Sequence, residues 1–165
     1  MLTDLNPPPT EPVALAEAKT FLRVDHDAED ALIGTLIRAA RERLEARLGV
    51  AMIRRAMRVA AGPGQTALPR HPVATIDAIR ADGDLTTDYV ADLRCRPAVV
   101  NVTGGVEVEI DFTAGYGSAP EDVPAPLRQA MLLLVAQGYE HRDTASETMP
   151  LMVDALTMPY RVVGL

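Results

Sequence analysis

Residues 28–48 read AEDALIGTLIRAARERLEARL and form the most regular stretch of this 165-residue chain. Apolar side chains recur in it every three or four residues, at Leu32, Ile33, Leu36, Ile37, Ala40, Leu44 and Leu48. Acidic residues open the stretch, Arg47 lies near its end and Gly49 follows it, as the helix dipole and the helix C-cap prefer. The pattern predicts an amphipathic helix about 30 Å long, enough to span a small domain.

A second long helix is expected far downstream, over residues 125–141. Pro124 and Pro126 suit a helix start, and an apolar stripe follows at Leu127, Met131, Leu134, Val135 and Gly138. A shorter helix is expected over residues 15–24. The two long helices most simply pack on each other, because each needs a partner for its apolar face.

The intervening residues have the period of strands rather than of helices. Residues 106–112, VEVEIDF, alternate between apolar and acidic side chains, which predicts one buried and one solvated face. Residues 99–102 precede them across Thr103-Gly104-Gly105, which favours a hairpin between the two strands. Further strands are expected over residues 53–60, 73–81 and 88–93.

These elements predict an α+β fold. It has a helical core of two long helices plus a short N-terminal helix, a β-strand insert between the long helices, and an extended C-terminal tail. The first segment is an extended arm because Pro7, Pro8, Pro9 and Pro12 exclude a helix. The predicted domains are the N-terminal arm 1–12, the helical core 13–49 with 124–143, the β-rich insert 50–123 and the C-terminal tail 144–165.

Residues 149–165 are apolar for a terminal segment, with only Asp154 and Arg161 charged. Terminal segments are normally polar, because a segment poor in apolar groups cannot offset the entropy of being ordered. Pro150 and Pro159 divide this segment into pieces too short to hold a helix alone. Such a tail either folds back on its own domain or docks on another chain, and the polar residues 143–147 that precede it favour docking.

Composition excludes several classes of protein. The net charge of −7 argues against nucleic-acid binding by the whole surface. The single Cys95 rules out an intrachain disulfide and fits a reducing cytosol. No apolar run approaches the roughly 20 residues of a membrane span, and the first residues lack a basic flank and an apolar signal core. We therefore expect neither membrane association nor secretion.

No catalytic or metal-binding constellation is visible, so we expect no enzyme, no cofactor and no metal. His26, His71 and His141 lie in three different segments, without a second His or Cys at metal-ligand spacing. Arginines flank Cys95 and favour a lowered thiol pKa, but no recognisable base accompanies it, so an inert cysteine is expected. Carboxylates of an acid–base pair need burial, whereas Glu107 and Glu109 share a solvated strand face.

The first long helix carries Arg38, Arg41, Glu42 and Glu45, which make two pairs at i,i+4 spacing, Arg38–Glu42 and Arg41–Glu45. The interleaved signs indicate a salt-bridged face, either exposed or between subunits, rather than a track for phosphates. Recognition of DNA by this helix is therefore disfavoured.

Several motifs together resemble the head–tail connector proteins, or adaptors, of tailed phages and phage-derived gene transfer agents. EPVALAEAK at residues 11–19, followed by FLRVD at 21–25, is similar to the family's opening, which leads into a long helix rich in Ala, Arg and Glu. IDFTAGYG at 110–117 is similar to its strand-to-loop junction, and VPAPLRQA at 123–130 to the start of a later helix. MPL at 149–151 and LTMPYR at 156–161 resemble its ending, with Met149 and Thr157 in place of leucines.

The resemblance implies a structural protein that forms a homo-oligomeric ring of twelve subunits beneath the portal protein of a DNA-filled capsid. Such a ring extends the DNA channel and offers a platform for a stopper (head-closure) or tail protein. The chain is implied to be made in the bacterial cytoplasm and to end in the neck of a virion or gene transfer agent particle. DNA passes without sequence-specific binding, and a net-acidic chain suits that passage because it repels phosphates.

The resemblance also implies a helical ring wall and a C-terminal segment that engages the portal. We therefore expect ring contacts at Arg38, Arg41, Glu42 and Glu45, and portal contacts at Leu151, Val153, Leu156, Tyr160, Arg161, Val162 and Leu165. Aromatic and Arg side chains often dominate interfaces, which favours Leu156, Tyr160 and Arg161 as anchors. Two other functions stay open: another neck protein, such as a stopper or tail terminator, and a small DNA-binding packaging protein.

Overall fold

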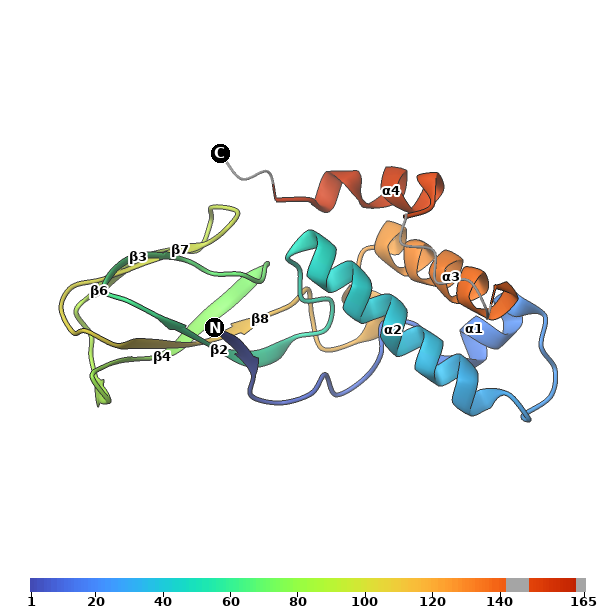
Figure 1. Ribbon diagram of the computed structural model, residues 1–165, viewed down its shortest axis with the longest axis horizontal. Coiled ribbons are helices and arrows are strands. Elements are labelled where there is room, and N and C mark those ends of the chain that lie inside the picture. The colour runs from blue at the N-terminus through green and yellow to red at the C-terminus, as the bar shows by residue number, and fades with distance from the viewer. Residues whose placement is uncertain (142–148, 163–165) are drawn as a thin grey trace. The chain divides into compact units, whose positions relative to one another are not determined.

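The computed structural model describes residues 1–141 and 149–162. The chain divides into two compact units, a β unit of Met1–Pro9 with Gly49–Ser118 and a helical unit of Thr10–Leu48 with Ala119–Leu165. Residues 142–148 and 163–165 of the helical unit, which include the whole polar segment 143–147 expected before the tail, lie outside the described residues. Figure 1 shows the elements along the chain.

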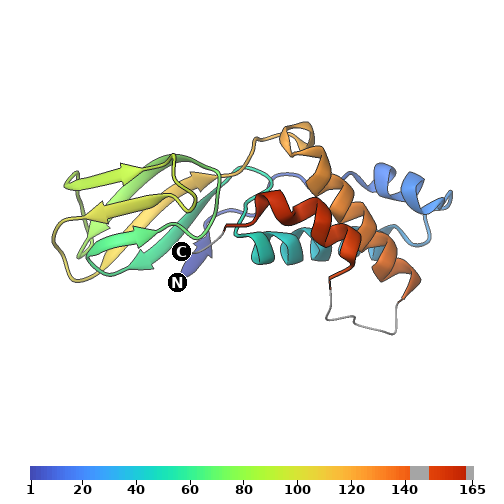
Figure 2. The same cartoon turned by 90° about the horizontal axis from the view of Figure 1, so that it is seen from above.

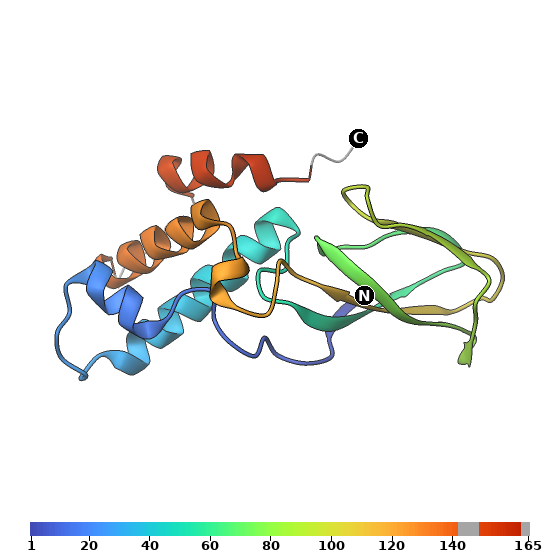
Figure 3. The same ribbon diagram turned by 180° about the vertical axis from the view of Figure 1, so that it is seen from behind.

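The described part of the helical unit contains α1 (Leu15–Leu22), α2 (Asp30–Leu48), η1 (Pro120–Asp122), α3 (Ala125–Glu140), α4 (Leu151–Thr157) and η2 (Met158–Tyr160), where η denotes a 3-10 helix. α2 packs along α3, α1 contacts both, and α4 packs on α3 (Figure 3). Their core is aliphatic, with Ile33, Ile37, Leu44, Leu127, Met131 and Val135 buried. Gly138 allows a close approach, because a Cβ there would lie 2.8 Å from Cδ2 of Leu36.

Ion pairs join the helices of this unit. Nζ of Lys19 on α1 donates to Oδ1 of Asp27 at 2.6 Å and to Oδ1 of Asp30 at 2.7 Å, which ties α1 to the start of α2. Arg128 of α3 donates to both carboxylate oxygens of Glu17 on α1, at 2.9 and 2.8 Å. Its Nε donates to the carbonyl of Pro12 at 3.1 Å, so the same guanidinium also fixes the segment that leads into α1.

The β unit consists of two antiparallel sheets, which Figure 2 shows as two layers of strands. The larger sheet has the order β1-β2-β8-β4-β5 and the smaller β3-β7-β6. The strands are β1 (Leu2–Asp4), β2 (Arg55–Ala61), β3 (Gly64–Ala67), β4 (Val73–Ala81), β5 (Asp84–Leu85), β6 (Tyr89–Asp92), β7 (Val99–Val102) and β8 (Val108–Ala114). One core lies between the sheets, with Met57, Ile110 and Phe112 from the larger sheet and Val100 and Val102 from the smaller.

The hairpin predicted from residues 99–102 and 106–112 is wrong. β7 pairs with β3 and β6, whereas β8 pairs with β2 and β4, so the chain crosses from one sheet to the other between them. The side chain of Asp82 holds the crossing, because its Oδ1 accepts the N–H groups of Val106 and Glu107 at 2.9 and 3.0 Å. The alternation of β8 determined which face is buried but not which strand is its neighbour.

The predicted fold class is also wrong in its architecture. The described residues form four α-helices and two antiparallel sheets, rather than a core of two long helices with one strand insert. The tail expected to be extended forms α4, although seven residues are too few for a stable helix in isolation. Packing on α3 compensates, because it buries Val153 and Thr157 completely.

Candidate docking surface

The C-terminal helix α4 is the element that most needs a functional explanation, because it is apolar on two opposite sides. Its inner side is seated on α3, where Val153 and Thr157 have no exposed surface. The hydroxyl of Thr157 donates to the carbonyl of Val153 at 2.8 Å, so this polar group is satisfied while buried. α4 is therefore a packed element of the helical unit.

The outer side of α4 is exposed. Leu151, Met152 and Met158 keep 90%, 64% and 63% of their surface accessible, and Ala155 is exposed as well. Leu151, Ala155 and Met158 follow the i, i+4, i+7 spacing of one helix face. Met158 retains helical backbone angles, so the face continues past the end of α4. We call Leu151, Ala155 and Met158 the outer stripe. An exposed apolar face of this kind is typical of a helix that inserts into a groove of a partner.

The single charged residue of α4 is held by two arginines. Oδ1 of Asp154 accepts from a terminal nitrogen of Arg47, on α2, at 2.8 Å, and from a terminal nitrogen of Arg161 at 2.8 Å. All three side chains are about one-third exposed. We call these three residues the clasp. It ties the middle of α4 to the last turn of α2 and joins Arg161, which follows η2, to the same carboxylate.

The residues predicted to contact the portal fall into different environments. Leu151 and Arg161 are exposed, Leu156, Tyr160 and Val162 are half-buried, and Val153 is fully buried against α3. Leu165 lies outside the described residues. In this conformation only some of the set has surface to offer a partner. Sequence reasoning missed Met152, Met158 and the clasp, although the spacing of Met158 from Leu151 could have indicated the outer stripe.

The four residues predicted to form ring contacts are also divided. Arg38 and Glu42 are exposed, but Arg41 and Glu45 are only 5% and 3% exposed. Arg41 donates to Glu45 at 3.0 Å, as the spacing predicts, and through Nε to Glu11 at 2.8 Å. Burial by itself lowers the pKa of Arg41, but the hydrogen bond to Glu11 and the charge of Glu45 outweigh burial, and the pKa is raised. Arg41 and Glu45 thus stabilise the subunit itself.

The outer face of the larger sheet carries a second cluster of charges. Asp111 on β8 accepts hydrogen bonds from Arg58 on β2 at 2.6 and 2.9 Å and from Arg80 on β4 at 2.7 Å. The hydrogen bond from Arg58 is the main reason that the pKa of Asp111 is lowered, and Arg80 adds to the effect. Because each acid is matched by an arginine on a neighbouring strand, this cluster is explained by sheet pairing.

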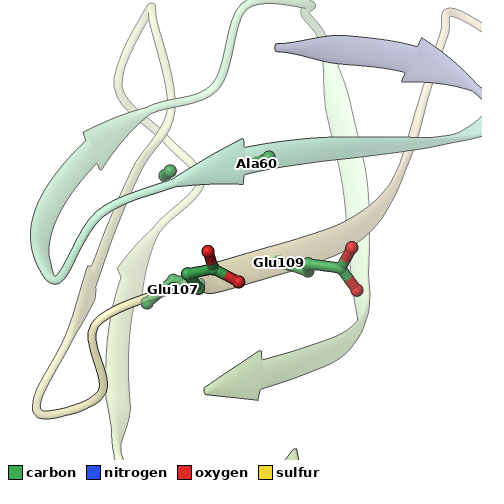
Figure 4. A pocket seen from close by; sticks show the side chains of 5 residues that line it. Ala60, Glu107 and Glu109 are labelled. Carbon is green, nitrogen blue, oxygen red and sulfur yellow. The ribbon is translucent and has the colours of Figure 1, made fainter. Parts of the chain in front are cut away.

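A shallow hollow of about 370 Å³ lies beside this cluster, lined by Ala60, Ala61, Glu107, Val108 and Glu109 (Figure 4). Glu107 is exposed, and Glu109 pairs with Arg58 at 3.3 Å. Neither carboxylate has the buried environment that a general acid requires. The hollow therefore gives no support for catalysis.

The described residues also give no support for a reactive cysteine or a metal site. Cys95 donates to Asp92 at 3.1 Å, and this hydrogen bond raises the pKa of the thiol, which is the reverse of activation. Among the described residues, no three His, Cys, Asp or Glu side chains come close enough to hold a metal ion. Within the same ranges of the chain, every helix is too short or too polar to cross a bilayer.

Comparison with known proteins gives a consistent result. The family model described as phage gp6-like head-tail connector protein matches residues 12–82. No curated protein matches the chain. Three of the solved structures that match cover all of this chain and 97% of their own. They are the neck of an empty gene transfer agent particle computed with C6 symmetry (32% identity, TM-score 0.83), the virion of a native particle (31%, 0.84) and the neck of a native particle computed with C12 symmetry (30%, 0.81).

The family match covers α1, α2 and the strands β2, β3 and β4, and the structural matches extend over both units. Identity of 30% or more over the full length goes beyond a shared fold. The family is one of structural proteins and is not a class of enzymes. The chain belongs to the head–tail connector family of tailed phages and phage-derived gene transfer agents.

Proposed function

We propose that this protein is the structural adaptor in the neck of a phage or gene transfer agent particle. It forms a ring of twelve copies beneath the portal protein, extends the DNA channel, and gives a platform for a stopper or tail protein. The observation that carries the proposal is the full-length similarity to chains of gene transfer agent necks, one of them computed with C12 symmetry. DNA passes through the ring without being read, which suits a chain of net charge −7.

The outer stripe of α4 is the proposed portal contact. Leu151 and Met158 are large apolar side chains on one exposed face, Met152 is exposed beside them, and all three come from the segment that the family resemblance assigns to the portal. Arg161, exposed after η2, donates to Asp154 through one terminal nitrogen, and its remaining N–H groups can donate to a carboxylate of the portal. Val153 contributes indirectly, because it seats the helix on α3.

The proposed ring contact lies on α2. Arg38 and Glu42 are exposed and one helical turn apart, so they offer a basic and an acidic group to the neighbouring subunit. Arg41 and Glu45 support this surface from within, because they hold α2 to the entering segment at Glu11. Charged pairs of this kind contribute more to specificity and register than to affinity.

The proposal is tested with the full-length chain and the purified portal protein of the same particle. Wild type should co-sediment with the portal, and electron microscopy should show a twelve-fold ring on it. The double variant L151E/M158E should fold normally, since both side chains are exposed, but should lose portal binding. L85E is the matched control, because Leu85 is 74% exposed in the β unit and should tolerate the change without effect.

Two results would contradict this proposal. Portal binding retained by L151E/M158E would exclude the outer stripe as the contact. Tight, strongly salt-dependent binding of duplex DNA by the free chain, without portal binding, would favour the DNA-binding alternative instead.

A further inference from the structure

The described C-terminal segment, residues 149–162, contains a helix that would not be stable by itself. α4 has seven residues and is apolar on both its inner and outer sides, so neither its length nor its outer surface favours a helix in water. Two observations show what holds it: the complete burial of Val153 and Thr157 against α3, and the clasp made by Arg47, Asp154 and Arg161.

The clasp defines the orientation of the helix, which apolar packing alone does not. Apolar contacts are non-directional, and α4 has apolar side chains on opposite faces that could exchange places on α3. Asp154 lies between the two faces and is tied to Arg47 on α2, so rotation of α4 about its axis would break that pair. Arg161 binds the same oxygen from beyond η2 and so ties the residue that follows η2 to α4.

We propose that Asp154 is a positioning residue that preforms the docking segment. The clasp keeps α4 helical and keeps Leu151, Ala155 and Met158 turned outward before a partner arrives. The segment then docks as a ready-made helix instead of folding on binding. This inference rests on the proposed function in so far as the partner is the portal protein. A segment that is already ordered binds with higher affinity, because the entropy lost on ordering it no longer opposes binding.

The same contacts could instead hold the segment in a closed state. The two roles predict opposite changes in portal affinity when the clasp is lost. If the clasp held the segment in a closed state that must open, its loss would increase the affinity for the portal. If the clasp preforms the binding conformation, its loss must reduce the affinity, because the competent state becomes a smaller fraction of the population.

The first experiment measures hydrogen exchange in the isolated full-length chain. D154N should speed the exchange of the amides of residues 153–158 by about three- to tenfold, and R47Q and R161Q each by a smaller factor, as partly exposed ion pairs allow. Exchange in α2 and α3 should not change. Salt at about 1 M should speed α4 exchange in wild type but hardly in D154N, since the pairs are screened. The control is E121Q, which removes an exposed acid from another part of the helical unit.

The second experiment measures binding to the purified portal protein. D154N should bind about three- to tenfold more weakly than wild type, while E121Q should bind equally well. Unchanged α4 exchange in D154N, or tighter portal binding by it, would overturn the proposal. If wild type itself fails to bind the portal, the proposed function fails and with it the docking role of the clasp. The exchange data would still decide whether the clasp orders α4.

Discussion

The guanidinium of Arg58 on β2 and the carboxylate of Asp111 on β8 lie side by side in the larger sheet and share two hydrogen bonds, Nε to Oδ1 at 2.6 Å and a terminal nitrogen to Oδ2 at 2.9 Å. The two residues are direct partners in the strand register, so the pair fixes the alignment of β2 on β8. Arg80 on β4 binds the same carboxylate from the other side. Three neighbouring strands are thus held at one point by a single acidic residue.

This arrangement predicts that the variant D111N loses stability, and that the loss depends on pH. Removing the charge should lower the free energy of unfolding by about 1.5–3 kcal/mol at neutral pH, as for a hydrogen bond to a charged group. The pKa of Asp111 is lowered in the folded state, so its contribution is present above the unfolded pKa and is lost as the pH falls through the folded one. Urea unfolding should therefore show a difference between wild type and D111N that shrinks below about pH 4. A difference independent of pH would contradict this account.

Gly115 is a position where only glycine fits. Its φ of +138° lies in the region that favours glycine, and a Cβ would come within 2.4 Å of Cα of Arg54, which is backbone and cannot rotate away. G115A should cost about 3 kcal/mol or more, measured by thermal or urea unfolding. G62A is the control, because Gly62 has no atoms within 4 Å of its Cβ position, and it should change stability by at most about 0.5 kcal/mol. Equal effects of the two changes would show that steric contact is not the cause.

Arg41 and Arg38 lie three residues apart on α2 and should behave in opposite ways. R41M should destabilise the helical unit by about 3–5 kcal/mol, because it breaks the buried ion pair with Glu45 by removing one of its two partners. R38M changes an exposed side chain and should leave unfolding almost unchanged, while it weakens assembly of the proposed ring. Unfolding curves measure the first effect, and analytical ultracentrifugation or electron microscopy of the portal complex measures the second. A folding defect in R38M would remove the distinction.

Asp82 should control the crossing between the two sheets. The N–H groups of Glu107 and Val106 lower the pKa of its carboxylate, in that order of importance. D82A should destabilise the β unit and speed hydrogen exchange at residues 106 and 107, because it removes their common acceptor. D82N should restore most of the loss, since an amide oxygen can accept the same bonds and Asn tolerates the φ of +52° found here. Failure of D82N to rescue would show that the negative charge itself is required.

Local patterns in the sequence predicted the regular elements well. The helix expected over residues 28–48 is α2 (Asp30–Leu48), that over 125–141 is α3 (Ala125–Glu140), and the strand over 73–81 is β4 (Val73–Ala81). Each is long and periodic, so the segment itself carries the information. The strands that β7 and β8 each pair with could not be predicted in this way. Strand partners depend on contacts between distant segments, such as Asp82 with Val106.

The candidate site was predicted in part. The unusual apolarity of residues 149–165 identified the segment that carries Leu151 and Arg161. It did not distinguish the inner Val153 from the outer Met158, because both are apolar and the distinction depends on where α3 lies. The clasp was invisible, since Arg47 and Asp154 are separated by more than a hundred residues.

The sequence by itself determined where the helices and most strands form, and its motifs in their order indicated the family that the comparisons show. Periodicity, caps and prolines act within a few residues, so their effects are legible along the chain. Tertiary structure alone decided that residues 99–112 divide between two sheets, that Arg41 is buried while Arg38 is exposed, and that residues 151–157 form a helix. The physical reason is the same in each case. Burial and ion pairing between distant segments supply free energy that local propensity does not contain.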